Sequence, residues 1–354
     1  MVKLVIVGTG GIAHWHAKSF QSIEGVQIVG ACDIDNDKVE AFTNEYNIEN
    51  TYNSFDDMLE HCEFDAISNA TPDPFHKEIA LKAIKKNKHV FSEKPLAENY
   101  PDAKEMYDAT KDTNLINMVN FTYRNSSGYQ KLAKIVQSGG IGKVRHVDAT
   151  YYQAWLTSKY SGDYRTQNKR LWRLSTAHGS MGTLGDLGVH IFDFASYPVG
   201  QITSINSRLK TFKDKGEKIG KYVLDANDTF ISMIEFDNGA IGTVSATRFA
   251  TGFKDRLDLK IFGDLGAVKI GFEDPVEEGN QYQITKDTER ERRKSDKLKW
   301  DTINTKPTPN NFERFIESIK NKTNDQPDFK RGAEIQKILD SCIKSSEENK
   351  WIIL

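Results

Sequence analysis

The chain contains 354 residues, with 48 lysines and arginines against 50 aspartates and glutamates, which gives a formal net charge of -2. This balance argues against a nucleic-acid-binding protein or a protein of anionic membranes, because both classes carry a basic excess. Hydrophobic residues make up 38% and aromatic residues 10% of the chain, which excludes a disordered chain and is enough for about two folded domains.

The first third of the chain alternates short apolar runs with amphipathic stretches. The apolar runs predict strands over residues 4–7, 26–32, 64–70, 88–92 and 115–119. The stretches among them predict helices over residues 12–21, 37–46, 75–86 and 102–110. Strands that alternate with helices form a parallel sheet covered on both faces, and right-handed crossovers make it doubly wound. We therefore expect an α/β domain over residues 1–122.

The pattern changes after about residue 125. One more helix is predicted over 126–137, followed by alternating strands over 144–152, 202–212, 229–236, 240–249, 256–262 and 267–272. Asn238-Gly239 lies between two alternating runs, which is a strong hairpin signal. This predicts an antiparallel sheet in an α+β domain over 123–354, whose last helices, within 312–348, can pack back on the first domain. The charged run 286–300 is interpreted as a solvated edge or loop.

A glycine turn joins the first predicted strand to the first predicted helix. Gly8, Gly10 and Ala13 fit the G-x-G-x-x-A pattern, in which the glycines allow a tight turn and a close approach of the backbone to a pyrophosphate. We expect the cofactor to contact this turn through Gly8, Thr9, Gly10, Gly11 and Ile12. Asp33 ends the second strand, where a carboxylate accepts hydrogen bonds from a ribose 2′-hydroxyl and repels a 2′-phosphate, so NAD is favoured over NADP. The alternative is a tight turn that binds no ligand.

Two further motifs make a family visible. Residues 92–97 read SEKPLA after the fourth predicted strand, and residues 182–193 read GTLGDLGVHIFD. With the glycine turn, these motifs closely resemble the glucose–fructose oxidoreductase / inositol dehydrogenase / MocA-like family. The resemblance covers nearly the whole chain. It implies an N-terminal Rossmann domain that binds a nicotinamide cofactor, and a C-terminal open, mostly antiparallel sheet that covers the active site and often forms the oligomer interface. Most members are NAD(P)-dependent dehydrogenases or reductases of sugars, inositols and related polyols.

By motif position, the resemblance implies that Lys94, Asp186 and His190 are catalytic. Oxidation of a secondary alcohol needs a base, and an imidazole with an ordinary pKa of about 6.5 suits that task near neutral pH. We therefore expect His190 to act as the general acid or base and Asp186 to orient the substrate or the imidazole. Lys94 is expected to polarise the reacting oxygen. Without the motifs, a turn lysine, a helix cap and a buried histidine would be the simpler interpretations.

Other positions resemble the walls of the family's site. Expected cofactor contacts, besides the glycine turn and Asp33, are Ala70, Thr71, Pro72, His76, Glu93, Lys94 and Asn120. Expected substrate contacts, besides the catalytic three, are Tyr123, Arg124, Trp172 and Arg173, for which packing between the domains is the alternative. His16 is expected to pack on or cap the first helix. A metal centre of Asp186, His190 and His178 would have only two well-spaced ligands, so no metal is expected.

Three functional classes stay open. The first is an NAD-dependent dehydrogenase of a sugar, sugar derivative or inositol. The second is a glycosidase that uses tightly held NAD for a transient oxidation, and the third is a non-catalytic cofactor-sensing or partner-binding protein on the same fold. The presence of Lys94, Asp186 and His190 together speaks against the third class.

The expected surroundings of the protein follow from its cysteines and its apolar runs. Cys32, Cys62 and Cys342 form no Cys-x-x-Cys pair, so a reducing cytoplasm fits. No apolar run approaches the roughly 20 residues of a membrane span or forms a signal peptide. We expect a cytoplasmic homodimer or homotetramer that binds a small polyol or sugar, and neither nucleic acid nor membrane.

Overall fold

The computed structural model describes residues 1–158, 160, 162–166, 170–178, 181–273, 280–286 and 299–354. The chain divides into two compact units: unit 1 comprises residues 1–121 and 309–336, and unit 2 comprises residues 122–308 and 337–354. No helix of the described residues is long and apolar enough to cross a lipid bilayer. Most of the charged run, residues 287–298, lies outside the described residues. The assignment of 1–122 and 123–354 to two domains stays a prediction.

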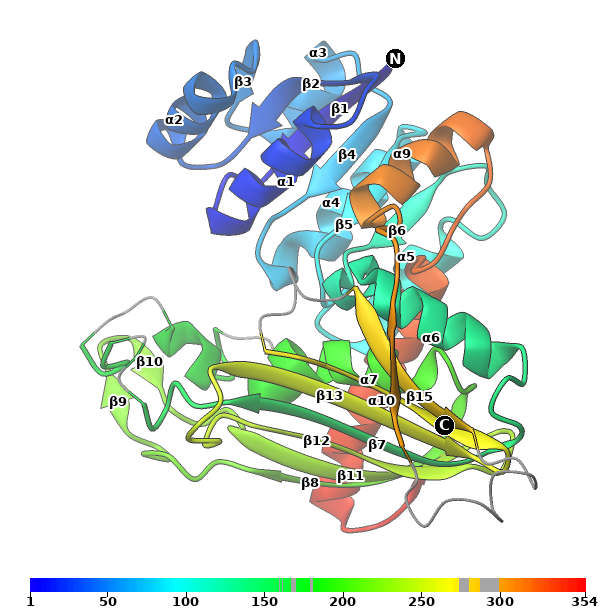
Figure 1. Cartoon of the computed structure of the whole chain (residues 1–354). Coiled ribbons are helices and arrows are strands. Elements are labelled where there is room, and N and C mark those ends of the chain that lie inside the picture. Colours follow the sequence, from blue (N-terminus) through cyan, green and yellow to red (C-terminus); the bar gives the residue numbers. More distant parts are fainter. Residues whose placement is uncertain (159, 161, 167–169, 179–180, 274–279, 287–298) are drawn as a thin grey trace. The chain divides into compact units, whose positions relative to one another are not determined.

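Unit 1 contains a six-stranded parallel sheet (Figure 1). Its strands are β1 (Val2–Val7), β2 (Val26–Cys32), β3 (Asn50–Tyr52), β4 (Ala66–Asn69), β5 (His89–Ser92) and β6 (Asn117–Val119). The order β3-β2-β1-β4-β5-β6 is that of a doubly wound Rossmann sheet. The predicted fold of this part is therefore confirmed.

Helices cover the strands of unit 1. They are α1 (Gly11–Gln21), α2 (Asn36–Tyr46), α3 (Phe55–His61), α4 (His76–Lys85), α5 (Tyr100–Asp108), α9 (Asn311–Asn321) and the start of α10 (Phe329–Glu348), with a short 3₁₀ turn η1 (Asp73–Phe75) before α4. Strand β3 and helix α3 were not predicted, because a three-residue strand and a seven-residue helix are too short for a clear periodicity.

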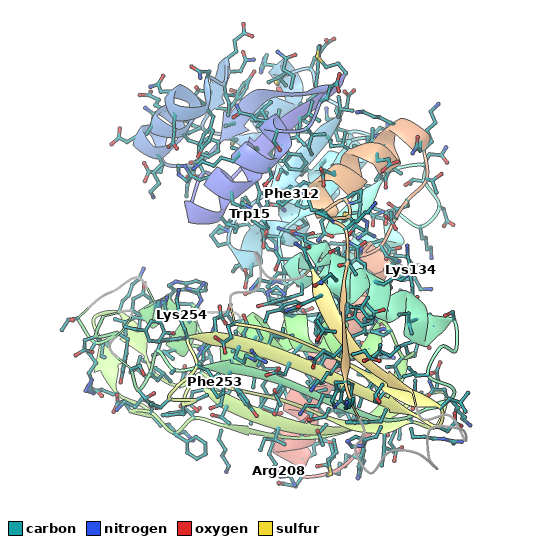
Figure 2. The ribbon with its side chains drawn as sticks, in the orientation of Figure 1. Trp15, Lys134, Arg208, Phe253, Lys254 and Phe312 are labelled. Atoms are coloured by element: carbon teal, nitrogen blue, oxygen red, sulfur yellow. The ribbon has the colours of Figure 1, made fainter. Side chains whose placement is uncertain are left out.

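Helix α9 joins the core of unit 1 although it lies far away in the sequence. It is next to α1 (Figure 1), and Phe312, Phe315 and Ile316 on its buried face belong to the same apolar cluster as the strands. Trp15 and Phe312 meet edge to face, with ring centroids 4.9 Å apart (Figure 2). Every fully buried apolar side chain of this size contributes roughly 1.5–3 kcal/mol to folding, so α9 is an integral part of unit 1.

Unit 2 contains a nine-stranded, mostly antiparallel sheet. Its strands are β7 (Val144–Gln153), β8 (Ile202–Lys210), β11 (Thr229–Phe236), β12 (Ile241–Thr247), β13 (Asp255–Gly263), β14 (Gly266–Phe272), β15 (Gln281–Lys286), β16 (Asp301–Asn304) and β17 (Ile352–Ile353). The order is β16-β15-β14-β13-β7-β12-β11-β8-β17, and β12 pairs with β7 in parallel. The predicted hairpins β11–β12 and β13–β14 are both present, so the predicted α+β fold is confirmed.

The remaining elements of unit 2 are helices, turns and a small ribbon. They are η2 (Thr122–Asn125), α6 (Ser127–Gln137), η4 (Leu171–Leu174), a π-helical turn η5 (Leu184–Gly188), α7 (Val189–Ser196), the ribbon β9 (Lys218–Ile219) with β10 (Tyr222–Val223), and the end of α10. All eight residues of α7 are buried, and Phe192 stacks on Phe230 of β11. Because side chains alternate along a strand, Ile231 and Met233 of β11 point to the opposite face, where they are exposed.

Candidate functional site

The glycine turn of unit 1 is open to a ligand. Gly8 has φ +86°, and a Cβ there would lie 2.8 Å from the backbone of Ala70 and Thr71, so only glycine lets the turn pack against that loop. Added Cβ atoms at Gly10 and Gly11 would meet no atom within 4 Å. No side chain caps α1 and no acidic residue lies in its first turn. A free helix N-terminus with an accessible backbone is suited to bind an anionic pyrophosphate.

Asp33 lies beside this turn. Its Oδ2 accepts hydrogen bonds from the backbone N–H of Thr9 at 2.7 Å and from the Thr9 hydroxyl at 3.0 Å, and its Oδ1 accepts from the backbone of Asp35 at 3.0 Å. The nearby Lys38 is paired with Asp35 at 2.7 Å, and the side chain after Asp33 is the exposed Ile34. The end of β2 therefore offers a carboxylate for ribose hydroxyls. The nearby cation, Lys38, is already paired with Asp35.

The loop 70–72 and the loop that carries Lys94 are tied together by His76. The His76 imidazole is fully buried, with Nδ1 2.7 Å from the Pro95 carbonyl oxygen and Nε2 2.8 Å from the Thr71 carbonyl oxygen. Asn69 adds a bond from its amide to the carbonyl of His76 at 3.1 Å. His76 thus lies beneath the two loops, and its predicted contact with a cofactor stays a prediction.

Glu93 and Asn120 follow β5 and β6 at the carboxyl ends of neighbouring strands. Glu93 Oε1 accepts hydrogen bonds from Asn120 Nδ2 at 2.6 Å and from His16 Nε2 at 2.8 Å. Burial alone would raise the pKa of the Glu93 carboxyl, but the hydrogen bonds of His16 and Asn120 and the charges of His16 and Lys94 together outweigh it and lower this pKa to about 2. Glu93 is therefore a buried carboxylate directly before Lys94.

The hydrogen bond between His16 and Glu93 was not predicted from the sequence. His16 lies on α1 three residues after Ala13, on the face that buries Ala17 and Phe20. A polar side chain on an apolar helix face needs a hydrogen-bonding partner. The position of His16 on this face therefore indicated that it has a partner. The sequence did not show that the partner is Glu93, 77 residues away.

In unit 2, a glycine and an asparagine shape the turn that holds Asp186. Gly182 has φ +66°, and a Cβ there would lie 2.4 Å from the Asn227 carbonyl oxygen. Asn227 donates from its side chain to the Met181 carbonyl at 2.6 Å and accepts from the backbone N–H of Leu184 at 2.9 Å. These bonds anchor the start of η5, which contains Asp186. No motif pointed to Asn227.

Asp186 is bound by two arginines. Its Oδ2 lies 2.9 Å from Arg248 Nη2 and 3.2 Å from Arg173 Nε. Arg248 is fully buried, which lowers the pKa of its guanidinium, although Asp186 opposes this effect. Arg173 lies over the ring of Trp172, 4.3 Å from its centroid. The structure therefore brings Asp186, Arg173 and Trp172 together and adds Arg248, which was not predicted from the sequence.

His190 lies on α7, near Tyr123. The Tyr123 and His190 rings meet edge to face with centroids 4.9 Å apart. The neighbouring Arg124 is buried and forms a two-pronged ion pair with Asp193, each N–O distance being 2.7 Å. This pair fixes the helix that carries His190. The predicted contact between Arg124 and a sugar stays a prediction.

Among the residues that the structure describes, no group of three or more His, Cys, Asp or Glu side chains could hold a metal ion. His178 lies instead 3.1 Å from the Ser175 hydroxyl through Nδ1 and edge-on to Tyr222. The candidate sites therefore consist of a sheet edge in unit 1, with the glycine turn and Lys94, and a cluster in unit 2 around Asp186 and His190.

Two models of one protein family match the chain. Residues 2–121 match the model described as "Oxidoreductase family, NAD-binding Rossmann fold", and residues 129–269 match the "GFO/IDH/MocA C-terminal domain".

Individual relatives are similar over most of the chain. A levoglucosan dehydrogenase of Pseudarthrobacter phenanthrenivorans is 31% identical over 64% of this chain, and the match spans 60% of that enzyme's length. A myo-inositol 2-dehydrogenase of Thermotoga maritima is 26% identical over 78% of this chain and 76% of its own. Among solved structures, a levoglucosan dehydrogenase in complex with NADH has a TM-score of 0.88 and 25% identity, covering 99% of this chain and 98% of that chain.

Proposed function

Because the chain belongs to the GFO/IDH/MocA oxidoreductase family, we propose that it is an NAD-dependent dehydrogenase acting on a secondary alcohol of a sugar, sugar derivative or inositol. The observation that carries this proposal is the sheet edge of unit 1, where the open glycine turn and Lys94 follow parallel strands of one sheet. Ligands bind at the carboxyl ends of the strands in such sheets. The relatives that act on levoglucosan and inositol support the substrate class.

The residues of unit 1 fit a nicotinamide dinucleotide. The α1 N-terminus is suited to hold the pyrophosphate and Asp33 the adenosine ribose, which favours NAD over NADP. The expected further contacts are Gly8, Thr9, Gly10, Gly11, Ile12, Ala70, Thr71, Pro72, His76, Glu93, Lys94 and Asn120. When bound, NAD supplies the acceptor for the hydride that leaves the alcohol carbon.

The protein's own residues handle the proton and the developing charge. His190 takes the proton of the substrate hydroxyl, or returns it in the direction of reduction. The Lys94 ammonium polarises the reacting oxygen and stabilises the alkoxide. Asp186, held by Arg173 and Arg248, orients the substrate hydroxyls. Tyr123, Arg124, Trp172 and Arg173 are the further proposed substrate contacts.

The test is NADH formation across a panel of inositols, aldoses, anhydrosugars and sugar phosphates. We expect turnover of at least one neutral polyol, and a loss of about 100-fold or more in kcat for Lys94→Ala and His190→Ala. This is the size expected when a group that stabilises the developing charge, or a general acid–base group, is removed. Glu98→Ala, an exposed residue near Lys94 in sequence, is the control and should keep wild-type activity. If the protein oxidises none of the compounds in the panel, the proposal is wrong. Release of an aglycone from a glycoside without net NADH formation would identify the glycosidase instead.

We propose further that the protein is a homodimer or homotetramer formed through the exposed face of β11 and β12. Ile231, Met233 and Ile241 lie on this face with exposed fractions of 58%, 48% and 56%. Apolar side chains gathered on one sheet face are typical of an interface. Sedimentation should give a dimer or tetramer for the wild type and a smaller species for Met233→Lys. A monomeric wild type would refute the assembly.

The free cysteines, of which Cys32 and Cys342 are buried, support a cytoplasmic location.

A further inference from the structure

A chain of buried polar side chains lies behind Lys94, inside unit 1. His16 places Nδ1 2.7 Å from the Ser68 hydroxyl and Nε2 2.8 Å from Glu93 Oε1, which also accepts a hydrogen bond from Asn120. His16, Ser68 and Asn120 have no exposed surface. The imidazole is enclosed by the rings of Phe91 and Phe312, whose centroids lie 5.6 and 5.2 Å away. Replacing a buried polar array of this kind by apolar side chains of similar volume often costs no stability, so stability alone does not account for it.

The array is not a second hydrolytic centre. Ser68, His16 and Glu93 are joined in the order of a serine hydrolase triad. However, the Ser68 hydroxyl lies on β4 in the middle of the sheet and is fully buried, so no substrate reaches it. The group that this array can influence is therefore the Glu93 carboxylate, to which His16 and Asn120 donate hydrogen bonds.

The two oxygens of Glu93 have different partners. Oε1 takes the side chains of His16 and Asn120, whereas Oε2 accepts a hydrogen bond from the backbone N–H of Lys94 at 3.2 Å. The backbone N–H groups of Glu93 and Asn120 continue the sheet with bonds to Asn69 and Ser92 at 3.0 and 2.8 Å. Since Oε1 is fixed by buried partners, the orientation of the carboxylate sets the position of the Lys94 backbone.

We propose that His16 is a positioning residue for Lys94: its hydrogen bond to Oε1 keeps Oε2 of Glu93 turned toward the Lys94 backbone N–H. The inference rests on the proposed function in one respect, the catalytic role of Lys94. The titratable groups whose charges act on Glu93 are His16 and Lys94, and both stabilise its anion. Removing the His16 side chain takes one hydrogen-bond donor away from the buried Glu93 carboxylate, so Glu93 takes up a proton or turns away, and Lys94 shifts with it.

The first arm of the experiment uses four variants in the holoenzyme. In His16→Gln the amide nitrogen replaces Nε2 and keeps the bond to Glu93, so kcat stays within about 3-fold of the wild type. In His16→Met that bond is lost, and kcat falls by about 10- to 100-fold while the KM for NAD changes little, because Lys94 is misplaced. Glu93→Gln keeps an acceptor for His16 but turns an amide N–H₂ toward the Lys94 N–H. Its kcat should therefore fall as much as that of His16→Met. Phe20→Leu is the matched control, since Phe20 lies on the same helix and packs on the same two rings.

The second arm needs no turnover. The Glu93 side-chain carboxyl, assigned by its absence in Glu93→Gln, is followed by carbon NMR during an acid titration of the protein without cofactor. It should stay ionised below pH 4, where ordinary glutamates with pKa values of about 4.3 take up protons.

The results of the two arms decide whether His16 positions Lys94. Retention of wild-type kcat by His16→Met or by Glu93→Gln, an equal loss in Phe20→Leu, or titration of Glu93 with the other glutamates overturns the proposal. If His16→Met does not fold, Glu93→Gln and the titration decide in its place. A wild type that oxidises no polyol defeats the proposed function alone, because the titration is repeated in His16→Met and still tests whether His16 holds the Glu93 carboxylate. In that variant the Glu93 carboxyl should take up its proton at a higher pH than in the wild type.

Discussion

At the scale of single residues, Arg248 has a charge that the interior of unit 2 has to accommodate. It is fully buried, it donates to Asp186 and to the Arg173 carbonyl, and its guanidinium lies 4.9 Å from the centroid of the Trp155 ring. Its Nε has no hydrogen-bonding partner among the described residues, a deficit that costs about 1–3 kcal/mol. The carboxylate of Asp186 is thereby paired with a fixed cation before any substrate arrives, which suits a group that orients hydroxyls rather than one that exchanges protons.

Glu93 makes the stability of the protein depend on pH. Its pKa is about 2 in the folded chain, against an ordinary value of 4.5. Because the folded value is the lower one, the stabilisation is fully present above pH 4.5 and is lost as the pH falls toward 2. A difference of this size corresponds to roughly 3 kcal/mol. Denaturant unfolding from pH 6 to pH 2 should therefore show a steeper loss of stability in the wild type than in Glu93→Gln. Parallel pH profiles for the two proteins would contradict this account.

At the scale of elements, α7 is a buried helix that an ion pair and a close glycine contact help to hold in place. The ion pair joins Arg124 of η2 to Asp193 of α7, and Tyr197 covers the guanidinium at 3.4 Å from its ring centroid. Burial opposes the charge of Arg124, but Asp193 raises the pKa of the guanidinium above its ordinary value. Gly188, just before α7, brings the helix close to β11, because a Cβ there would lie 3.3 Å from the Phe230 ring. These contacts determine where His190 lies in unit 2.

The ion pair predicts an asymmetric response to substitution. Arg124→Met should destabilise the protein by about 3–5 kcal/mol, since it leaves the buried Asp193 carboxylate without a partner. The double variant Arg124→Met with Asp193→Leu should recover most of that loss, because it removes both charges. Urea unfolding measures the two effects. A single variant as stable as the wild type, or a double variant no better than the single one, would show that the pair does not hold α7.

At the scale of the whole molecule, the two compact units do not follow a single cut in the chain. Residues 309–336, near the C-terminal end, belong to unit 1, and their α9 fills its core with Phe312, Phe315 and Ile316. Helix α10 starts in unit 1, and its residues from Lys337 onward belong to unit 2. Each unit thus contains segments from both parts of the chain.

This organisation predicts how a fragment behaves. Residues 1–122 alone should lose roughly 5 kcal/mol or more of apolar burial through the absence of the three α9 side chains, and should be unfolded or aggregated. The same fragment extended through a flexible linker with residues 309–328 should melt cooperatively by circular dichroism. A shortened fragment that melts as cooperatively as the extended one would contradict the role of α9 in unit 1.

The sequence by itself determined the features that are local in the chain. The alternation of strands and helices predicts the parallel sheet, and Asn238-Gly239 predicts its hairpin, because periodicity and turn chemistry depend only on neighbouring residues. The glycine turn and the motifs around Lys94 and His190 pointed to the family, which the two family models then matched. Very short elements such as β3 were not predicted, since three residues do not define a period.

Only the tertiary structure decided which buried polar groups are partners. His16 meets Glu93 across 77 residues and Arg248 meets Asp186 across 62, and nothing near either residue in sequence identifies its partner. The same holds for Arg124 and Asp193, 69 residues apart. The physical reason is that a buried charge must be neutralised wherever the packed chain places it. A residue's neighbours in the chain show that it is buried, whereas the fold alone determines which opposite charge lies within reach.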